Sequence, residues 1–147
     1  MKSLITLTIT LIASLNFALA QGLFASSYVE KTNISPKMGT QIGYQFDWGV
    51  EVGVFFQDEA DFLNHGEIKR PRFYEKSFTG VFFAYPILET KNLDLKLNVR
   101  TGAVNKINFA ITPSLIGTYS LHKNLKVFSG IGVRTFRPTL QAGIKFS

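Results

Sequence analysis

Apolar and polar residues alternate with a period of two over most of this chain, which predicts β-strands with one apolar face. In 93–100 every odd position is aliphatic and every even position is polar or charged. The segments 50–56 and 139–146 alternate in the same way, and Val50, Val52, Val54 and Phe56 share one face of the first. The repeated alternation predicts an all-β protein.

Eight segments combine this alternation with β-branched residues, aromatic residues and closely spaced glycines. They are 23–30, 38–46, 50–57, 73–85, 92–103, 107–121, 125–135 and 138–146. In two segments the pattern does not decide which face points outward. Both faces of 73–85 are apolar, and in the first segment Phe24 and Tyr28 compete with the residues beside them.

Two short loops support this register, because the residues that flank a hairpin loop share a face. The loop Asp47-Trp48-Gly49 lies between two apolar residues and places Gly49 where a left-handed backbone is wanted. The loop His122-Lys123-Asn124 is flanked in the same way, and Asn124 also tolerates that conformation. Both loops predict antiparallel hairpins.

The first 20 residues have a different pattern. Lys2 precedes an apolar stretch from Leu4 to Leu15, and Ala18-Leu19-Ala20 offers the small residues of a cleavage site. This order predicts a secretory signal peptide over 1–20, followed by one domain over 21–147. The apolar stretch is shorter than the about 20 residues that a spanning helix needs.

Segment and loop lengths favour a barrel in a membrane, where a strand needs about 9 to 11 residues. An even number of antiparallel strands places both ends of the domain on the periplasmic side. The odd-numbered connections then face outward and are expected to be the longer ones. The third connection, 58–72, is the longest, whereas the seventh is very short.

Aromatic residues gather near both ends of the predicted strands, as they do in the girdles of membrane barrels. Those near the periplasmic ends are Phe46, Trp48, Tyr85, Tyr119 and Phe146, and those near the outer ends are Phe56, Phe73 and Phe109. The opposite strand face carries the charged residues Glu51, Asp94, Lys96, Arg100, Arg134 and Lys145. We expect these charges to form an ion-pair network in the lumen, because buried charges must be paired.

The terminal stretch Thr139-Leu-Gln-Ala-Gly-Ile-Lys-Phe-Ser147 alternates and carries an aromatic, Phe146, as its penultimate residue. On this pattern the chain resembles the small eight-stranded outer-membrane β-barrel proteins of Gram-negative bacteria, similar in plan to the membrane domain of OmpA and to OmpX. The resemblance implies an eight-stranded antiparallel up-and-down transmembrane β-barrel in the cell outer membrane. It also implies the barrel-assembly machinery as a partner during biogenesis.

Eight strands enclose a lumen wide enough only for side chains or one small ligand. The favoured interpretation is therefore a barrel with a structural or surface-interaction role, neither a wide pore nor an enzyme. A lipid-modifying outer-membrane enzyme is one alternative, with His65 near the acidic residues of the third connection as its base. His122 lies beside Ser120 in an inner turn, away from outer-leaflet substrate, and is most simply a hairpin residue.

A soluble secreted lipocalin-like barrel that binds a small apolar ligand is the other alternative. Its aliphatic strand face would turn inward, and that face includes Leu93, Leu95, Leu97 and Val99. The direction of this face therefore separates the soluble barrel from the membrane barrel.

Outer-membrane lipid and lipopolysaccharide are the expected partners. Lys69, Arg70 and Arg72 form a basic group at the predicted outer rim, and arginine presents a planar fork suited to phosphate. The absence of cysteine excludes disulfides and thiolate metal sites, and we expect no cofactor and no metal. The pI is near 9.7, but a secreted chain does not ordinarily meet nucleic acid. The sequence leaves the oligomeric state open.

Overall fold

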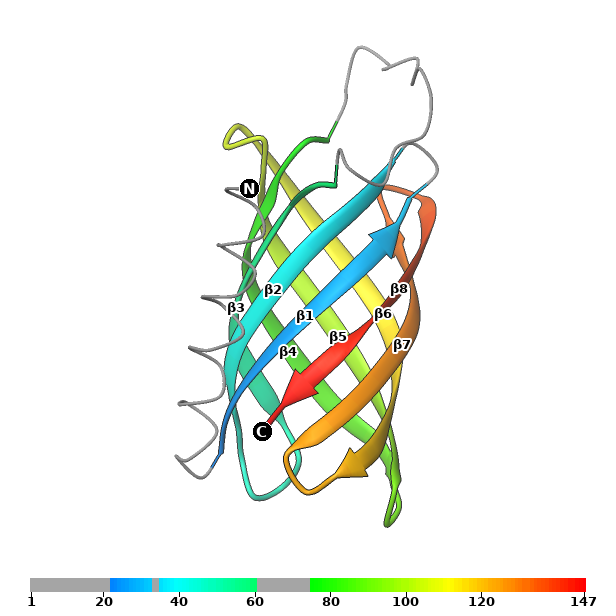
Figure 1. The fold of residues 1–147 in the computed structure, drawn as a ribbon. Helices are drawn as coiled ribbons and strands as arrows, with labels where there is room; N and C mark the ends of the chain where they lie inside the picture. The colour runs from blue at the N-terminus through cyan, green and yellow to red at the C-terminus, as the bar shows by residue number, and fades with distance from the viewer. Residues whose placement is uncertain (1–21, 33–34, 61–74) are drawn as a thin grey trace, which may run out of the picture.

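The computed structural model describes residues 22–32, 35–60 and 75–147, and these form one closed barrel (Figure 1). Its strands are β1 (Leu23–Lys31), β2 (Pro36–Gln45), β3 (Glu51–Glu59), β4 (Phe78–Glu89), β5 (Leu93–Val104), β6 (Asn108–His122), β7 (Leu125–Arg134) and β8 (Arg137–Phe146). Each strand pairs antiparallel with the next, and β1 pairs with β8 to close the ring. The predicted eight-stranded antiparallel up-and-down barrel is confirmed.

Several predictions concern residues outside the described part of the chain. They are the signal peptide over 1–20, His65, Phe73 and the basic group of Lys69, Arg70 and Arg72. Within the described residues, no helix is long and apolar enough to cross a membrane.

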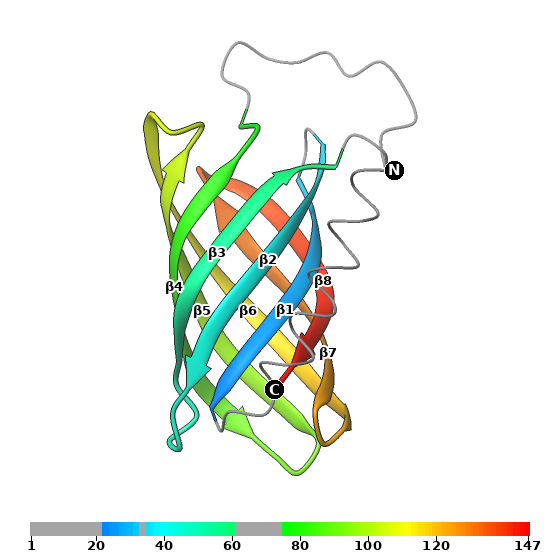
Figure 2. The same ribbon diagram turned by 60° about the vertical axis from the view of Figure 1, so that its left-hand side comes forward.

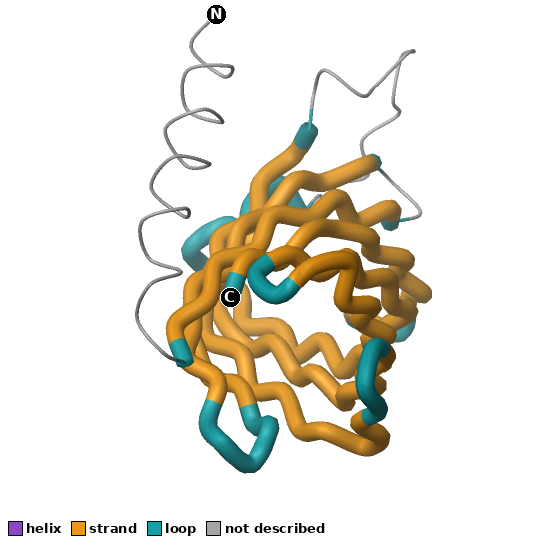
Figure 3. The backbone as a smooth tube through the Cα atoms, turned by 60° about the horizontal axis from the view of Figure 1, so that its bottom comes forward, coloured by secondary structure: helices purple, strands orange, loops and turns teal. Residues whose placement is uncertain are grey.

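The barrel has two rims, which Figure 2 shows from the side. The lower rim carries the C-terminus, the start of β1 and the turns at 46–50, 90–92 and 123–124. The upper rim carries the end of β1, the start of β2 and the turns at 105–107 and 135–136. Figure 3 looks from below and shows the strands as a ring.

The strand β4 differs most from its predicted bounds of 73–85. It begins at Phe78 and continues past Tyr85 to Glu89. Pro86 has no N–H to donate, and the ladder to β5 shifts register between Pro86 and Leu88. A bulge tolerates proline inside a strand, which is why β4 does not end where the sequence predicts.

The turns confirm one predicted loop and correct another. Gly49 has a φ of 84°, as the hairpin at 46–50 requires. The predicted three-residue loop at 122–124 is instead a two-residue turn, because His122 pairs with Leu125 and the ladder shifts register between Ser120 and His122. Asn124, which could tolerate a left-handed backbone, does not adopt one; in the described residues the non-glycine positions with a positive φ are Asn105, Lys106, Thr135 and Phe136.

The structure decides the faces that the sequence left open. Phe24 and Tyr28 of β1 point inward and are each 2% exposed. Phe78 and Phe82 of β4 also point inward and are 0% and 3% exposed. Val50, predicted on the outer face, is 1% exposed and precedes β3. Val50 belongs to the turn before β3, and Gly49 of the same turn lies against the end of β4. The alternation of the strand therefore does not extend to Val50.

Glycine makes room for the large inward side chains. Gly39 lies directly beneath the ring of Tyr28, and a Cβ at this position would come within 2.4 Å of the Tyr28 Cζ. Gly43 and Gly53 face each other across β2 and β3 beneath the rings of Phe24 and Phe82. The lumen is therefore packed with side chains on a wall thinned by glycine.

Candidate functional site

The lumen is the strongest candidate site, because its buried polar and charged residues outnumber its buried apolar ones. The buried charged side chains come from six strands. Lys37 on β2 donates to the Glu75 carbonyl oxygen, and the other six charged side chains meet at two levels. We call these the Glu30 cluster, near the upper rim, and the Glu51 cluster, near the lower rim.

The Glu30 cluster consists of Glu30, Arg100, Arg134, Tyr28 and Gln57. Both carboxylate oxygens of Glu30 accept from a guanidinium, Oε2 from Arg100 and Oε1 from Arg134. Arg100 Nη1 also donates to the Tyr28 hydroxyl at 2.9 Å, and Arg134 Nη2 donates to Gln57 Oε1 at 2.9 Å. These charges are shielded from bulk solvent, since Glu30 and Arg100 are 0% exposed.

Aromatic rings surround the two guanidinium groups. The Arg134 Cζ lies 4.5 Å from the centroid of the Phe78 ring. The Arg100 Cζ lies 5.4 Å from the Tyr28 centroid and 5.8 Å from the Phe55 centroid. Ring faces attract cations, so these contacts partly replace the water that the arginines have lost.

The Glu51 cluster consists of Glu51, Lys96 and Lys145. Glu51 Oε1 accepts from Lys96 Nζ at 2.5 Å and from Lys145 Nζ at 2.6 Å. Lys96 Nζ also donates to the Gly49 carbonyl oxygen at 3.2 Å, and Lys145 Nζ lies 3.8 Å from the Phe24 ring centroid. One carboxylate thus joins three strands and the hairpin at 46–50.

The Glu30 cluster reaches across the barrel. Arg100 on β5 contacts Glu30 on β1, and Arg134 on β7 contacts Gln57 on β3. Three strands lie between the partners on either side of a ring of eight, so the partners come from opposite walls. The Glu30 cluster therefore spans the lumen.

The two clusters contain most of the six predicted lumen charges. Five of them lie buried there, and Asp94 stands apart on β5, half-buried and without an ion pair to any described residue. The sequence reasoning missed Glu30, because the inner face of β1 had not been assigned. The signal that could have found Glu30 is its even spacing from Phe24 and Tyr28 on the same strand.

The predicted interface aromatics lie on the outer wall at both rims. Phe46, Trp48, Tyr85 and Tyr119 are exposed near the lower rim, and Phe146 there is half-buried. Tyr44, which the sequence reasoning did not single out, stacks on Phe46 at 5.1 Å, and Phe46 contacts Trp48 at 5.8 Å between centroids. Phe56 and Phe109 are exposed toward the upper rim, at 52% and 72%.

The described residues supply little for the enzymatic alternative. His122 is exposed at the end of β6 and makes no side-chain hydrogen bond to a described residue. No group of three or more His, Asp or Glu side chains in the described ranges could hold a metal ion.

Comparison with known proteins supports the fold and nothing finer. No family model and no curated protein matches the chain. A de novo designed transmembrane β-barrel is similar with a TM-score of 0.68 at 11% identity, over 86% of this chain and 96% of the design. The designed barrel TMB2.3 gives a TM-score of 0.64 at 11% identity, over 86% of this chain and 93% of the design.

Neisserial surface protein A gives a TM-score of 0.40 at 15% identity, over 84% of this chain and 93% of that one. At these identities the likeness to the two designed barrels concerns the fold alone. The class that the fold defines is the small, closed, antiparallel β-barrel, of which the designed transmembrane barrels are examples.

Proposed function

We propose that this protein is a small barrel of the outer membrane, with a structural or surface-interaction role and a lumen closed by its own side chains. The observation that carries the proposal is the inverted polarity of the wall. Large apolar side chains cover the outside, while the inside holds charged and amide side chains together with buried aromatic ones.

One hydrogen-bonded row across β2, β3 and β4 illustrates the outer surface. Ile42, Val54 and Val81 are paired side by side and are 53%, 57% and 54% exposed. Water disfavours such a surface by about 25 cal/mol for each Å² of apolar area, whereas hydrocarbon does not. A closed barrel also leaves no unpaired strand edge, which hydrocarbon would not tolerate.

The direction of β5 argues against the lipocalin-like alternative. Leu93 and Leu97 point outward and are 47% and 44% exposed, while Lys96 points inward at 4%. A soluble barrel with an apolar ligand inside would need the reverse arrangement. We therefore favour the membrane barrel over the soluble lipocalin-like barrel.

The contacts across the lumen support a closed barrel more than a wide pore. Arg100 and Tyr28 fill the level of the Glu30 cluster and are 0% and 2% exposed. Lys96 and Lys145 narrow the lumen again at the Glu51 cluster. Two successive levels of paired charge occupy the lumen. An interaction partner would therefore meet the outer wall or the rims.

Membrane fractionation combined with gel mobility tests the proposal. We expect the protein in the outer-membrane fraction, soluble only with detergent, and we expect the unheated sample to migrate differently from the boiled one because the closed barrel resists the gel detergent. A periplasmic soluble protein and an inner-membrane protein from the same cells serve as controls. Recovery in the soluble fraction without detergent would overturn the proposal.

A further inference from the structure

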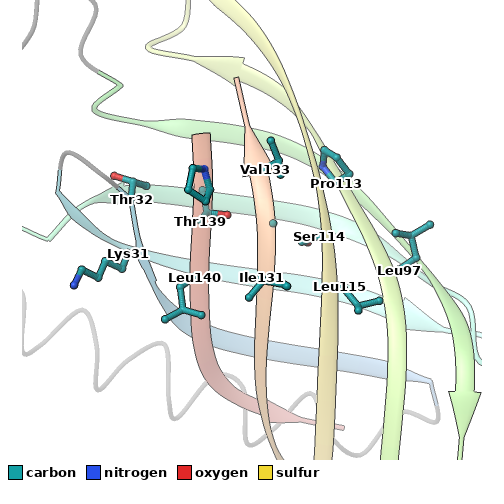
Figure 4. A pocket seen from close by; sticks show the side chains of 12 residues that line it. Lys31, Thr32, Leu97, Pro113, Ser114, Leu115, Ile131, Val133, Thr139 and Leu140 are labelled. Atoms are coloured by element: carbon teal, nitrogen blue, oxygen red, sulfur yellow. The ribbon is translucent and has the colours of Figure 1, made fainter. Parts of the chain in front are cut away.

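The outer wall of the barrel is hollowed by a groove near the upper rim, which crosses β5, β6, β7, β8 and the end of β1 (Figure 4). Its volume is about 810 Å³. Most of the side chains that line it are apolar. Ser114 and Thr139 are polar residues along its length, and Lys31 and Thr32 lie at one end. The other end is at Leu97.

One side of the groove follows a single hydrogen-bonded row of outward residues, and Pro113, Val133 and Pro138 of the next outward row form the other side. The paired residues in order are Lys31, Leu140, Ile131, Leu115 and Leu97. Lys31 is the last residue of β1 at the upper rim, whereas Leu97 is the fifth residue of β5 counted from the lower rim. The row therefore descends from the rim into the middle of the wall.

A break in the sheet deepens the groove. The ladder between β6 and β7 ends at the pair Ser114 and Gly132, although both strands continue toward the upper rim. The next outward position on β6 is Pro113, which has no N–H to continue the ladder. Inside the barrel, Arg134 Nε donates to Thr112 Oγ1 at 3.1 Å and bridges the break.

The dimensions fit one hydrocarbon chain. Four interstrand spacings of about 4.8 Å give a row about 19 Å long, comparable with one leaflet of a hydrocarbon core about 30 Å thick. Adjacent outward rows are about 6.8 Å apart, which admits a single chain between them.

The charge at the upper end selects the kind of lipid. Lys31 is exposed, and its paired neighbours Pro36 and Leu140 are uncharged. Among the described residues it has no ion-pair partner. Lysine at the level of the headgroups attracts anionic lipid.

We propose that this groove binds one acyl chain of an anionic phospholipid, whose phosphate pairs with Lys31. The inference rests on the proposed membrane-spanning barrel. Among the described residues that line the groove, Lys31 is the one cation. One cation at the end of a groove one chain wide matches a lipid with one phosphate, whereas a multiply phosphorylated lipid would call for a group of cations.

Tryptophan quenching by brominated lipid tests the site. Trp48 lies at the lower rim and is the chain's one tryptophan, so a Trp48→Phe background allows a new reporter. Leu97→Trp places the reporter at the deep end of the groove, and Val54→Trp is the matched control, exposed on β3 outside the groove. Both variants are reconstituted in phosphatidylcholine vesicles that contain a minor fraction of phosphatidylglycerol brominated on its acyl chains.

The extent of quenching gives the fraction of brominated lipid next to each tryptophan. We expect this fraction to be higher at Leu97→Trp than at Val54→Trp. The expected enrichment is about fivefold, which corresponds to the attraction of one lysine for an anionic headgroup. Adding Lys31→Glu should abolish the enrichment, whereas Lys76→Glu, an exposed lysine beside β4 at the same rim, should leave it. Equal quenching at both reporters, or enrichment that survives Lys31→Glu, would overturn the lipid site.

Two further outcomes distinguish a failure of the proposed membrane-spanning barrel from a failure of the assigned lipid. Brominated phosphatidylcholine should quench both reporters if the wall faces hydrocarbon, so quenching of neither by any brominated lipid would refute the membrane-spanning barrel. If unlabelled lipid A relieves the quenching at Leu97→Trp at lower concentration than phosphatidylglycerol does, the assignment to a phospholipid is wrong.

Discussion

Glu30 is the residue on which the charge balance of the upper lumen depends. Its two oxygens neutralise two arginines from different strands, and all three side chains are at most 2% exposed. Removing one partner of such a buried group leaves a charge without compensation, which costs more than the intact pair contributes. The carboxylate therefore determines whether Arg100 and Arg134 can remain inside.

We predict that Glu30→Gln lowers the free energy of unfolding by about 3 to 5 kcal/mol, because Arg100 loses its buried counter-charge and Arg134 keeps only the ion pair to Glu75 at 3.5 Å. Urea unfolding of the vesicle-inserted protein, followed by Trp48 fluorescence, measures this loss. Glu89→Gln is the matched control, since Glu89 is exposed at the end of β4 and should change stability by no more than about 0.5 kcal/mol. Equal stability of the two variants would contradict the structural role of Glu30.

Gly39 provides a second test at a single residue. We predict that Gly39→Ala destabilises the barrel by about 1 to 3 kcal/mol, because its Cβ would displace the Tyr28 ring and lengthen the 2.9 Å bond to Arg100. Gly117→Ala is the control. Gly117 faces outward, and the nearest atom to its added Cβ is 3.9 Å away, so the same unfolding assay should find little change. A Gly39→Ala variant as stable as Gly117→Ala would show that the ring is not held in place.

At the scale of elements, the turns at the upper rim carry backbone strain. The connection between β7 and β8 has only two residues, Thr135 and Phe136, with φ of 49° and 63°. Two consecutive positive φ values define the tight hairpin turn that Asn-Gly adopts most readily. Neither threonine nor phenylalanine favours this conformation.

We predict that the double substitution Thr135→Asn, Phe136→Gly stabilises the barrel by about 1 to 2 kcal/mol, because it removes the left-handed strain from two residues. The side chain of Phe136 is 99% exposed, so little packing is lost. The midpoint of urea unfolding should rise. A lower midpoint would indicate that Phe136 contributes a contact to the membrane surface that outweighs the strain.

Most strands could be predicted from the sequence because each strand separates two environments, and its residues therefore alternate. The reasoning failed where that contrast is weak. In β1 the aromatic residues Phe24 and Tyr28 lie on the inner face, and in β4 aromatic residues lie on both faces, as Phe82 and Phe83 show. At Pro86 a bulge continues a strand that the local sequence ends.

The candidate site was predictable only in part, for a geometric reason. Alternation identified Arg100 and Lys96 as inward residues of one strand, but it could not assign them to different clusters. Which charge Arg100 meets depends on which strands lie opposite each other once the ring closes, and closure pairs β1 with β8. That pairing joins the two ends of the sequence and leaves no local signal.

At the scale of the whole molecule, we propose that the outer wall meets hydrocarbon, while the charged side chains lie in the lumen. The claim links the apolar row on β2, β3 and β4, the aromatic residues at both rims and the two charge clusters. It also sets the environment in which the groove beside Lys31 could bind lipid. A measurement of what surrounds the wall therefore tests every level of the account.

The most direct measurement is the accessibility of single spin labels in lipid vesicles. The chain has no cysteine, so Ile42→Cys, Val54→Cys and Val81→Cys each give one labelling site on the outer wall, and Lys123→Cys gives a control at the exposed turn of the lower rim. We predict that the three wall labels relax more with oxygen, which concentrates in hydrocarbon, than with a water-soluble nickel chelate, and that Lys123→Cys does the reverse. Preferential relaxation of the wall labels by the nickel chelate would contradict the membrane-spanning barrel.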